Sequence, residues 1–127
     1  LLDRIDMHIE VPSVEYEAMR RKEKPETSAQ VRARVNAARE LQKQRFSGTG
    51  VSCNAYMTPA MIGQYCLLDA AGERLMKGAF DRLGLTGRSH DRILRMARTI
   101  ADLDASPDIQ AAHLAEAIQY RSSNLLK

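Results

Sequence analysis

Two arginines are the residues of this sequence best suited to chemistry. Arg88 stands in the first turn of a predicted helix, and Arg4 stands just before a predicted strand. A guanidinium is planar and always charged, so it can stabilise the negative charge of a phosphoryl group. The sequence contains no nucleophile–base pair, no H-E-x-x-H motif and no glycine-rich phosphate loop. We therefore expect the chain to place cations on a phosphate held elsewhere, and to catalyse nothing alone.

The position of Arg88 has two interpretations. A positive charge in the first turn of a helix is unfavourable by up to about 1 kcal/mol, because the helix dipole is positive at that end. An anion bound at the helix start would remove this penalty and would also engage the free backbone amides. The spacing thus leaves open a phosphate site and a solvated arginine. For Arg4 it leaves open a functional role and a weak local ion pair with Asp3 or Asp6.

Arg88 belongs to a predicted amphipathic helix over Leu85–Leu103. The apolar residues of this helix share one face of a helical wheel. They are Ile93, Leu94, Ala97, Ile100 and Ala101. Arg88, Arg92 and Arg95 lie on the opposite face. We interpret Arg92 and Arg95 as a solvated or interface face, which leaves Arg88 as the candidate for a phosphate contact.

The elements around this helix predict an all-α fold. The chain has 127 residues, of which 44% are hydrophobic, enough for one domain with a core. The periodicity predicts a small helical bundle preceded by one orphan strand around Asp6–Val11. Helices are expected over 27–46, 58–66, 69–83, 85–103 and 107–121. We divide the chain into a strand and linker (1–26), poorly ordered in isolation, a helical domain (27–122) and a tail (123–127).

Several helix boundaries and inward faces follow from particular residues. Ser106 is expected to cap the last helix, with Pro107 in its first position. The residues predicted to face inward are Val31, Val35, Ala38, Leu41 and Phe46 in the first helix, Leu75, Met76, Ala79, Phe80 and Leu83 before Gly84, and Ala111, Leu114, Ala115 and Ile118 in the last helix.

Composition narrows the classes of function. The net charge is only +3, aromatic residues make up 5% and Trp is absent, which argues against a dedicated nucleic-acid-binding domain. A basic stripe of Arg32, Arg39 and Lys43 is either a solvated helix face or a phosphate-binding surface.

Cys53 and Cys66 are expected to be reduced thiols, with Cys66 buried. The histidines are far apart in the sequence, which predicts no metal site. Because no signal segment or membrane span is found, we expect a cytoplasmic protein, and the initial Leu indicates a piece of a longer one.

Three stretches together resemble the C-terminal part of magnesium-chelatase-like AAA+ ATPases, in the competence-protein ComM/YifB branch. They are LLDRIDMHIEVP at the start, RVNAARELQKQRF in the first long helix, and LTGRSHDRILRMARTIADL followed by IQAAHLAEAIQYR. The resemblance covers nearly the whole chain and implies the α-helical lid of such an ATPase. The first dozen residues would then be the last strand of its nucleotide-binding core.

The resemblance also implies roles for both arginines. Arg4 matches the arginine finger, which acts in trans on ATP held by a neighbouring subunit. Arg88 matches the sensor-2 arginine, which contacts an ATP phosphate. The family usually writes this motif S-x-R, and here Thr86 stands in place of the serine. A threonine can still cap a helix, so the motif keeps its structural function.

Cofactors and partners are implied in the same way. ATP with magnesium would be bound by the full-length protein, and no cofactor is expected for this chain alone. The implied partners are neighbouring subunits of a homo-oligomeric, hexameric ring and DNA, as in branch migration during transformation, with no membrane. The residues themselves leave open an alternative, a nucleic-acid-binding or subunit-docking helical module without direct phosphate contact.

Overall fold

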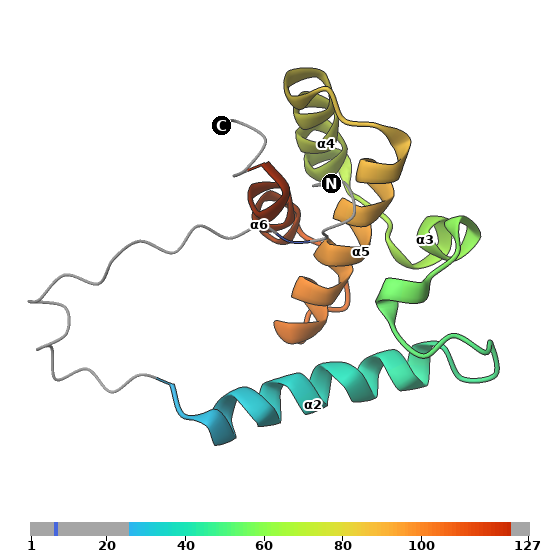
Figure 1. Ribbon diagram of the computed structural model, residues 1–127, viewed down its shortest axis with the longest axis vertical. Coiled ribbons are helices and arrows are strands. Elements are labelled where there is room, and N and C mark those ends of the chain that lie inside the picture. The colour runs from blue at the N-terminus through green and yellow to red at the C-terminus, as the bar shows by residue number, and fades with distance from the viewer. Residues whose placement is uncertain (1–6, 8–25, 123–127) are drawn as a thin grey trace, which may run out of the picture.

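The computed structural model describes residue 7 and residues 26–122 (Figure 1). Within them the elements are α2 (Ser28–Arg45), the 3-10 helix η2 (Asn54–Tyr56), α3 (Pro59–Tyr65), α4 (Ala70–Leu83), α5 (Gly87–Leu103) and α6 (Ala111–Ser122). This part of the chain contains no sheet, and Leu68 and Ile109 form an isolated parallel bridge. The predicted all-α bundle is therefore confirmed. Apart from Met7, the predicted strand around Asp6–Val11 lies outside the described residues.

Side-chain caps explain where most helices begin. Thr27 and Gln30 form a capping box at the start of α2. Thr58 caps α3, and Asp69 caps α4 by accepting from the backbone N–H of Gly72 at 2.7 Å. Gly84 ends α4 in the left-handed region (φ 62°), where glycine carries no steric penalty. Each of these signals acts within one turn of its helix.

The last helix begins later than predicted. It starts at Ala111, not at Pro107, and Ser106 does not cap it. The Ser106 Oγ instead donates to the carbonyl of Asp108 at 2.7 Å. The carbonyls of Ser106 and Pro107 accept from the guanidinium of Arg98, at 2.8 and 3.1 Å. Because a helix starting at Pro107 would need these carbonyls for its own hydrogen bonds, the segment stays a loop.

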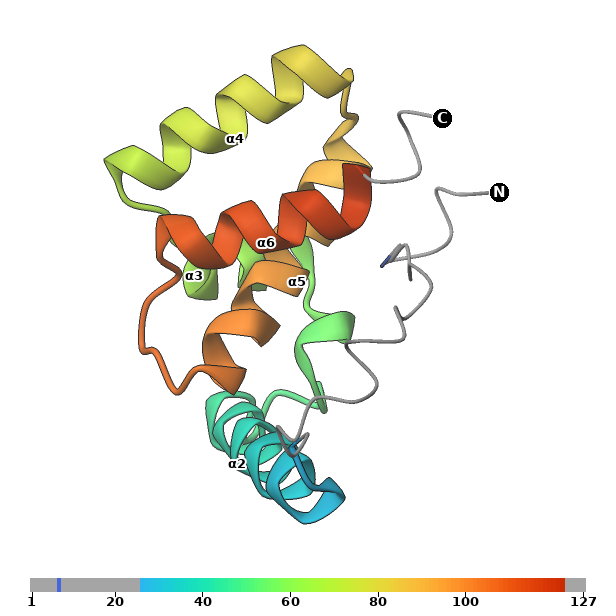
Figure 2. The ribbon, with the colours of Figure 1, turned by 90° about the vertical axis from the view of Figure 1, so that its left-hand side faces the viewer.

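Helix α5 is the centre of the bundle. It packs against α2, η2, α3 and α6, while α4 packs on α6 (Figures 1 and 2). The core members that are almost fully buried are Phe46, Met57, Ile62, Cys66, Met76, Ala79, Ile93, Ala97, Ala101, Ile109, Leu114 and Ala117. In α4 and α6, two inward predictions were wrong, because Phe80 is 38% exposed and Ala115 is exposed. None of the described helices has the length and apolar character needed to cross a membrane.

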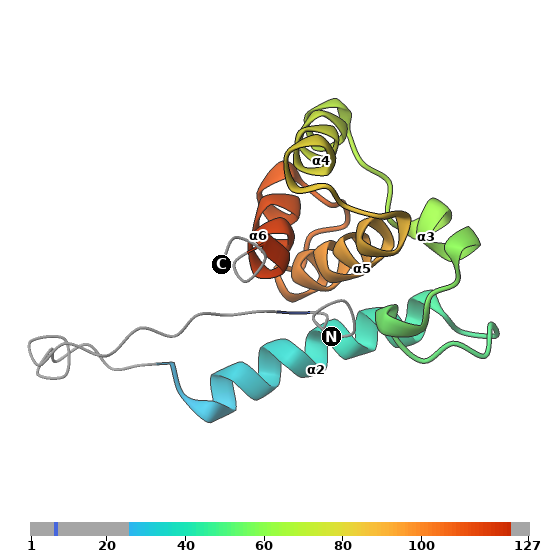
Figure 3. The same ribbon diagram turned by 45° about the horizontal axis from the view of Figure 1, so that its top comes forward.

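Helix α2 contacts the bundle through its C-terminal half. Ala38 and Gln42 are its buried residues, and the C-cap Phe46 is buried too. The predicted apolar face is wrong at Val31 and Leu41, which are 38% and 39% exposed. Figures 1 and 3 show the reason for Val31, since the N-terminal half of α2 extends beyond the end of α5.

Candidate functional site

Arg88 lies in the first turn of α5, two residues after the capping residue Thr86. The Thr86 Oγ1 accepts from the backbone N–H of Ser89 at 3.2 Å. Gly84 terminates α4, and Leu85, which lies between Gly84 and the cap Thr86, is buried. The connection between α4 and α5 is therefore short and packed against the core. The structure therefore places Arg88 at the N-terminus of a well-packed helix, as the sequence predicted.

The surroundings of Arg88 favour an anion. The side chain is exposed, and it forms no hydrogen bond or ion pair with any described residue. The backbone N–H groups of Gly87 and Arg88 likewise have no acceptor within the described chain. These N–H groups point out along the helix axis at the positive end of its dipole. A guanidinium and free amides at one helix start can bind a phosphate oxygen together.

The neighbouring arginines of α5 face the protein instead. Arg95 is half-buried, and its Nη2 donates to the carbonyl of Met57 at 3.1 Å. Arg92 is half-buried as well. The Thr99 Oγ1 accepts from Asn54 Nδ2 at 3.1 Å, so this side of α5 holds η2 in place. Arg95 thus makes a contact within the protein, which its interpretation as part of a solvated or interface face did not include. Arg88 is exposed.

A buried ionic cluster joins α2, η2 and α5. The carboxylate of Asp102 is fully buried and accepts hydrogen bonds from both terminal nitrogens of Arg45, at 2.7 and 2.8 Å. It also accepts from Asn54 Nδ2 at 2.9 Å and lies 3.2 Å from Arg98 Nη2. The hydrogen-bonded carboxylate of Asp102 raises the pKa of Arg45 above its ordinary value, so Arg45 remains charged. The cluster fixes the C-terminal end of α2 onto the bundle.

Sequence reasoning missed this cluster. Arg98 and Asp102 are four residues apart on the flank of the apolar face of α5, which is a detectable signal for an ion pair. Arg45 lies 57 residues before Asp102, and no local pattern connects the two. Arg32, Arg39 and Lys43 of the basic stripe are all exposed, as either interpretation of that stripe requires.

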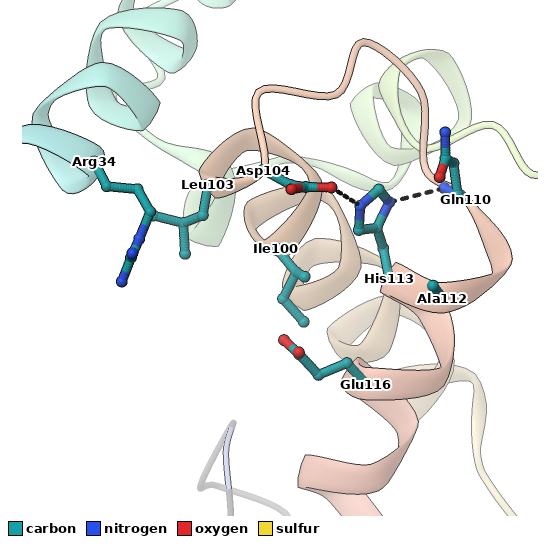
Figure 4. A pocket seen from close by; sticks show the side chains of 8 residues that line it. All are labelled: Arg34, Ile100, Leu103, Asp104, Gln110, Ala112, His113 and Glu116. Carbon is teal, nitrogen blue, oxygen red and sulfur yellow. Dashed lines mark hydrogen bonds and ion pairs between the residues drawn. The ribbon is translucent and has the colours of Figure 1, made fainter. Parts of the chain in front are cut away.

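A pocket of about 460 Å³ lies where the end of α5 meets α2 and α6 (Figure 4). In it, His113 Nε2 is 2.9 Å from Asp104 Oδ2, and His113 Nδ1 accepts from the backbone N–H of Gln110 at 3.0 Å. Because a backbone N–H can only donate, Nδ1 is unprotonated and Nε2 carries the proton. Nε2 thus joins the start of α6 to the end of α5, and Nδ1 binds the backbone directly before α6. Along α5 this pocket is about 24 Å from Arg88, so it is not part of the same site.

The described residues contain no cluster of three His, Cys, Asp or Glu side chains able to hold a metal ion. Cys66 is buried in the core and Cys53 is half-buried, and both are free thiols. Burial raises the pKa of the Cys66 thiol from an ordinary value of 9.0 to about 11, and the nearby arginines Arg98 and Arg45 offset only part of this effect. Cys66 is therefore a protonated core residue near neutral pH.

We expect the free energy of unfolding to fall by about 3 kcal/mol between about pH 9 and pH 11 because of Cys66. In that range the thiol of the unfolded chain ionises, while the folded thiol, with its raised pKa, keeps its proton. Urea denaturation across the range measures the effect. The Cys66→Ala variant supplies the background from all other groups. Parallel pH profiles for the two proteins would contradict the assignment.

The comparison with known families assigns the chain. The family described as "Magnesium chelatase, subunit ChlI C-terminal" matches residues 25–121. The chain belongs to this family. The match contains the helices of the described residues, except for Ser122 at the end of α6, and the site at Arg88. Arg4 precedes the match and also lies outside the described residues.

Relatives of this magnesium chelatase C-terminal domain are similar along almost the entire chain. The competence protein ComM of Haemophilus influenzae is 39% identical over 95% of this chain and 23% of its own length. The uncharacterized protein YifB of Escherichia coli is 38% identical over 98% of this chain and 24% of its own length. The chain thus spans about a quarter of the curated relatives that it matches. The resemblance to the ComM/YifB branch is confirmed.

Proposed function

We propose that this chain is the helical lid of an AAA+ ATPase of the magnesium chelatase type, and that Arg88 contacts a phosphate of ATP. The observation that carries the proposal is the arrangement at the start of α5. There an exposed guanidinium adjoins two backbone N–H groups for which the described chain supplies no acceptor. The arrangement suits one phosphate contact, and the rest of the nucleotide would be held by a core domain.

The lid position gives this contact a second consequence. A charge-assisted contact made from the lid depends on which phosphates are present, so it favours a different lid position before and after hydrolysis. Arg88 would then act as the sensor of the nucleotide state. The packed connection between α4 and α5 would transmit the change to the bundle, because Leu85 is buried immediately before the cap.

The remaining elements of the proposal rest on the family. Arg4 would be the arginine finger, supplied to ATP on a neighbouring subunit of a hexameric ring. Magnesium would be bound with ATP by the core. DNA is the proposed substrate of the full-length motor, and the name of the Haemophilus influenzae relative, a competence protein, supports it.

The test is Arg88→Ala in the full-length protein. The rate constant of ATP hydrolysis is expected to fall on the order of 10²-fold, because one preorganised donor to the developing phosphate charge is lost. Steady-state ATPase assays measure it, and thermal unfolding checks that the exposed side chain is not needed for folding. Arg74→Ala removes another exposed arginine, from α4, and should leave the rate unchanged. An Arg88→Ala protein with the wild-type rate would refute the sensor role.

A further inference from the structure

The basic stripe of α2 is a straight row of exposed cations. Arg32, Arg39 and Lys43 follow one another at intervals of seven and four residues, so they lie in line on one face of the helix. The row spans about 16 Å, and it lies about 100° around the helix axis from the face that packs on the bundle. Within the described residues, none of the three cations forms a hydrogen bond or an ion pair. The stripe is therefore open to a partner along its length.

The charges around the basic stripe do not cancel. The two other arginines of α2, Arg34 and Arg45, each pair with a carboxylate outside the helix. The one carboxylate within α2 is Glu40, which leaves an excess of two positive charges when it is set against the stripe. Residues 46–68, which follow α2, include no charged residue. That segment therefore supplies no counter-charge to the stripe.

An exposed aromatic side chain lies beside the C-terminal half of α2. Tyr56, the last residue of η2, is 69% exposed. Two residues earlier, the backbone N–H of Asn54 donates to Gln42 Oε1 at 3.0 Å, and Gln42 directly precedes Lys43. This bond holds η2 against α2 (Figures 1 and 3). The ring of Tyr56 contributes little to the core, and it is free to stack on another flat group.

We infer that this face of α2 binds a single strand of DNA, with the basic stripe contacting its phosphates and Tyr56 stacking on a base. A straight row of cations complements the repeated charge of a nucleic-acid backbone, and an exposed ring complements an unpaired base. An acidic protein surface would match the cations but would leave Tyr56 without a role. The low net charge of the chain does not conflict with this, because a strand contacts the local row. The inference rests on the part of the proposed function that names DNA as the substrate.

The primary experiment is fluorescence anisotropy of a labelled oligo(dT) titrated with the 127-residue chain at several NaCl concentrations. Three phosphate contacts predict weak binding, with Kd on the order of 10–100 µM at low salt. The slope of log K against log[NaCl] should be about −2, because each neutralised phosphate of a single strand contributes about −0.7. The duplex of the same oligo(dT) with oligo(dA) should bind more weakly, since its bases are already stacked. Absence of binding at low salt, or tighter binding of the duplex, would overturn the inference.

Two charge-matched double variants test the location. Arg39→Ala with Lys43→Ala should weaken binding of oligo(dT) on the order of 10-fold and reduce the salt slope to about −0.7. Arg74→Ala with Lys77→Ala removes the same charge from exposed positions of α4, and it should leave both the affinity and the slope unchanged. Because all four residues are exposed, neither double variant should disturb folding. Equal weakening by both would show an effect of net charge alone and would overturn the inference.

Tyr56 distinguishes a nucleic-acid strand from an acidic protein partner. Tyr56→Ala should weaken binding of oligo(dT) on the order of 10-fold without changing the salt slope, because stacking releases no counterions. Tyr56→Phe keeps the ring and should bind like the wild type. Poly-glutamate has no bases and should compete poorly. Wild-type affinity in Tyr56→Ala, or poly-glutamate that competes as effectively as unlabelled oligo(dT), would assign the stripe to an acidic protein surface and overturn the inference.

Arg88→Ala keeps this test apart from the proposed ATP contact. Along α5, Arg88 is about 21 Å from Asp102, where α2 is attached, so Arg88→Ala should bind oligo(dT) like the wild type. Loss of oligo(dT) binding in Arg88→Ala would place the strand at the start of α5 and overturn the inference. If the wild-type chain binds no DNA while Arg88→Ala abolishes ATPase activity, the inference fails and the sensor role stands. Binding that depends on Arg39 and Lys43, in a protein whose ATPase rate is insensitive to Arg88→Ala, would support the inference and refute the sensor role.

Discussion

Asp102→Ala is expected to lower the free energy of unfolding by about 3–5 kcal/mol, which is a large part of the stability of a small domain. The change leaves Arg45 and Arg98 without their shared carboxylate, and Arg98 has almost no access to water. It also removes the acceptor of Asn54 Nδ2 and loosens the attachment of α2 to α5. Urea denaturation followed by circular dichroism measures the loss, as a decrease of about 2 M in the midpoint.

Matched variants separate the buried charge from a general effect of removing an aspartate. Asp81→Ala, at an exposed position of α4, should change stability by no more than about 0.5 kcal/mol. Adding Arg98→Met to Asp102→Ala should recover part of the loss, because one uncompensated buried charge is removed with it. A midpoint for Asp102→Ala within error of the wild type would show that the cluster is not a stabilising element.

The second large effect is expected at Arg4. Under the proposed function, Arg4→Ala in the full-length protein should reduce the rate constant of ATP hydrolysis on the order of 10³-fold while ATP still binds. The physical reason is that a guanidinium supplied to the transferring phosphoryl group stabilises charge that is greatest in the transition state. Single-turnover hydrolysis measures the chemical step, and equilibrium binding of a fluorescent ATP analogue measures nucleotide affinity. Arg21→Ala, in the predicted linker, is the control and should keep the wild-type rate.

A mixing experiment tests whether Arg4 acts in trans. Subunits with Arg4→Ala keep an intact nucleotide site, and subunits with a disabled nucleotide site keep an intact Arg4. Mixed rings should therefore regain part of the ATPase activity that neither protein shows alone. Absence of recovery in rings shown to be mixed would rule out the trans role and would return Arg4 to a local ion pair.

The parts of the fold that could be predicted depend on contacts between residues near in sequence. The caps at Thr27, Thr58 and Thr86 and the left-handed Gly84 were readable, because each acts within one helical turn. The placement of Arg88 followed from such a cap, and so the candidate site could be found before the structure was known.

The features that could not be predicted depend on distant partners. The late start of α6 is caused by Arg98, which occupies the carbonyls of Ser106 and Pro107. The pairing of Arg45 with Asp102 bridges 57 residues, so helical periodicity could not detect it. The exposure of Val31 had the same origin, because an apolar position on a helix shows a preference for burial and not whether a partner helix reaches it.

The projecting half of α2 gives the bundle a mechanical property. Arg45 fixes the helix at its C-terminal end, and the 18 residues of α2 make a rod about 27 Å long. A tilt of about 10° at that attachment displaces Ser28, at the opposite end, by about 5 Å. Any small rotation at the buried ionic cluster would therefore produce a larger displacement at the end where α2 joins the preceding chain. In such a movement α2 would act as a lever, with its pivot at the pair of Arg45 and Asp102.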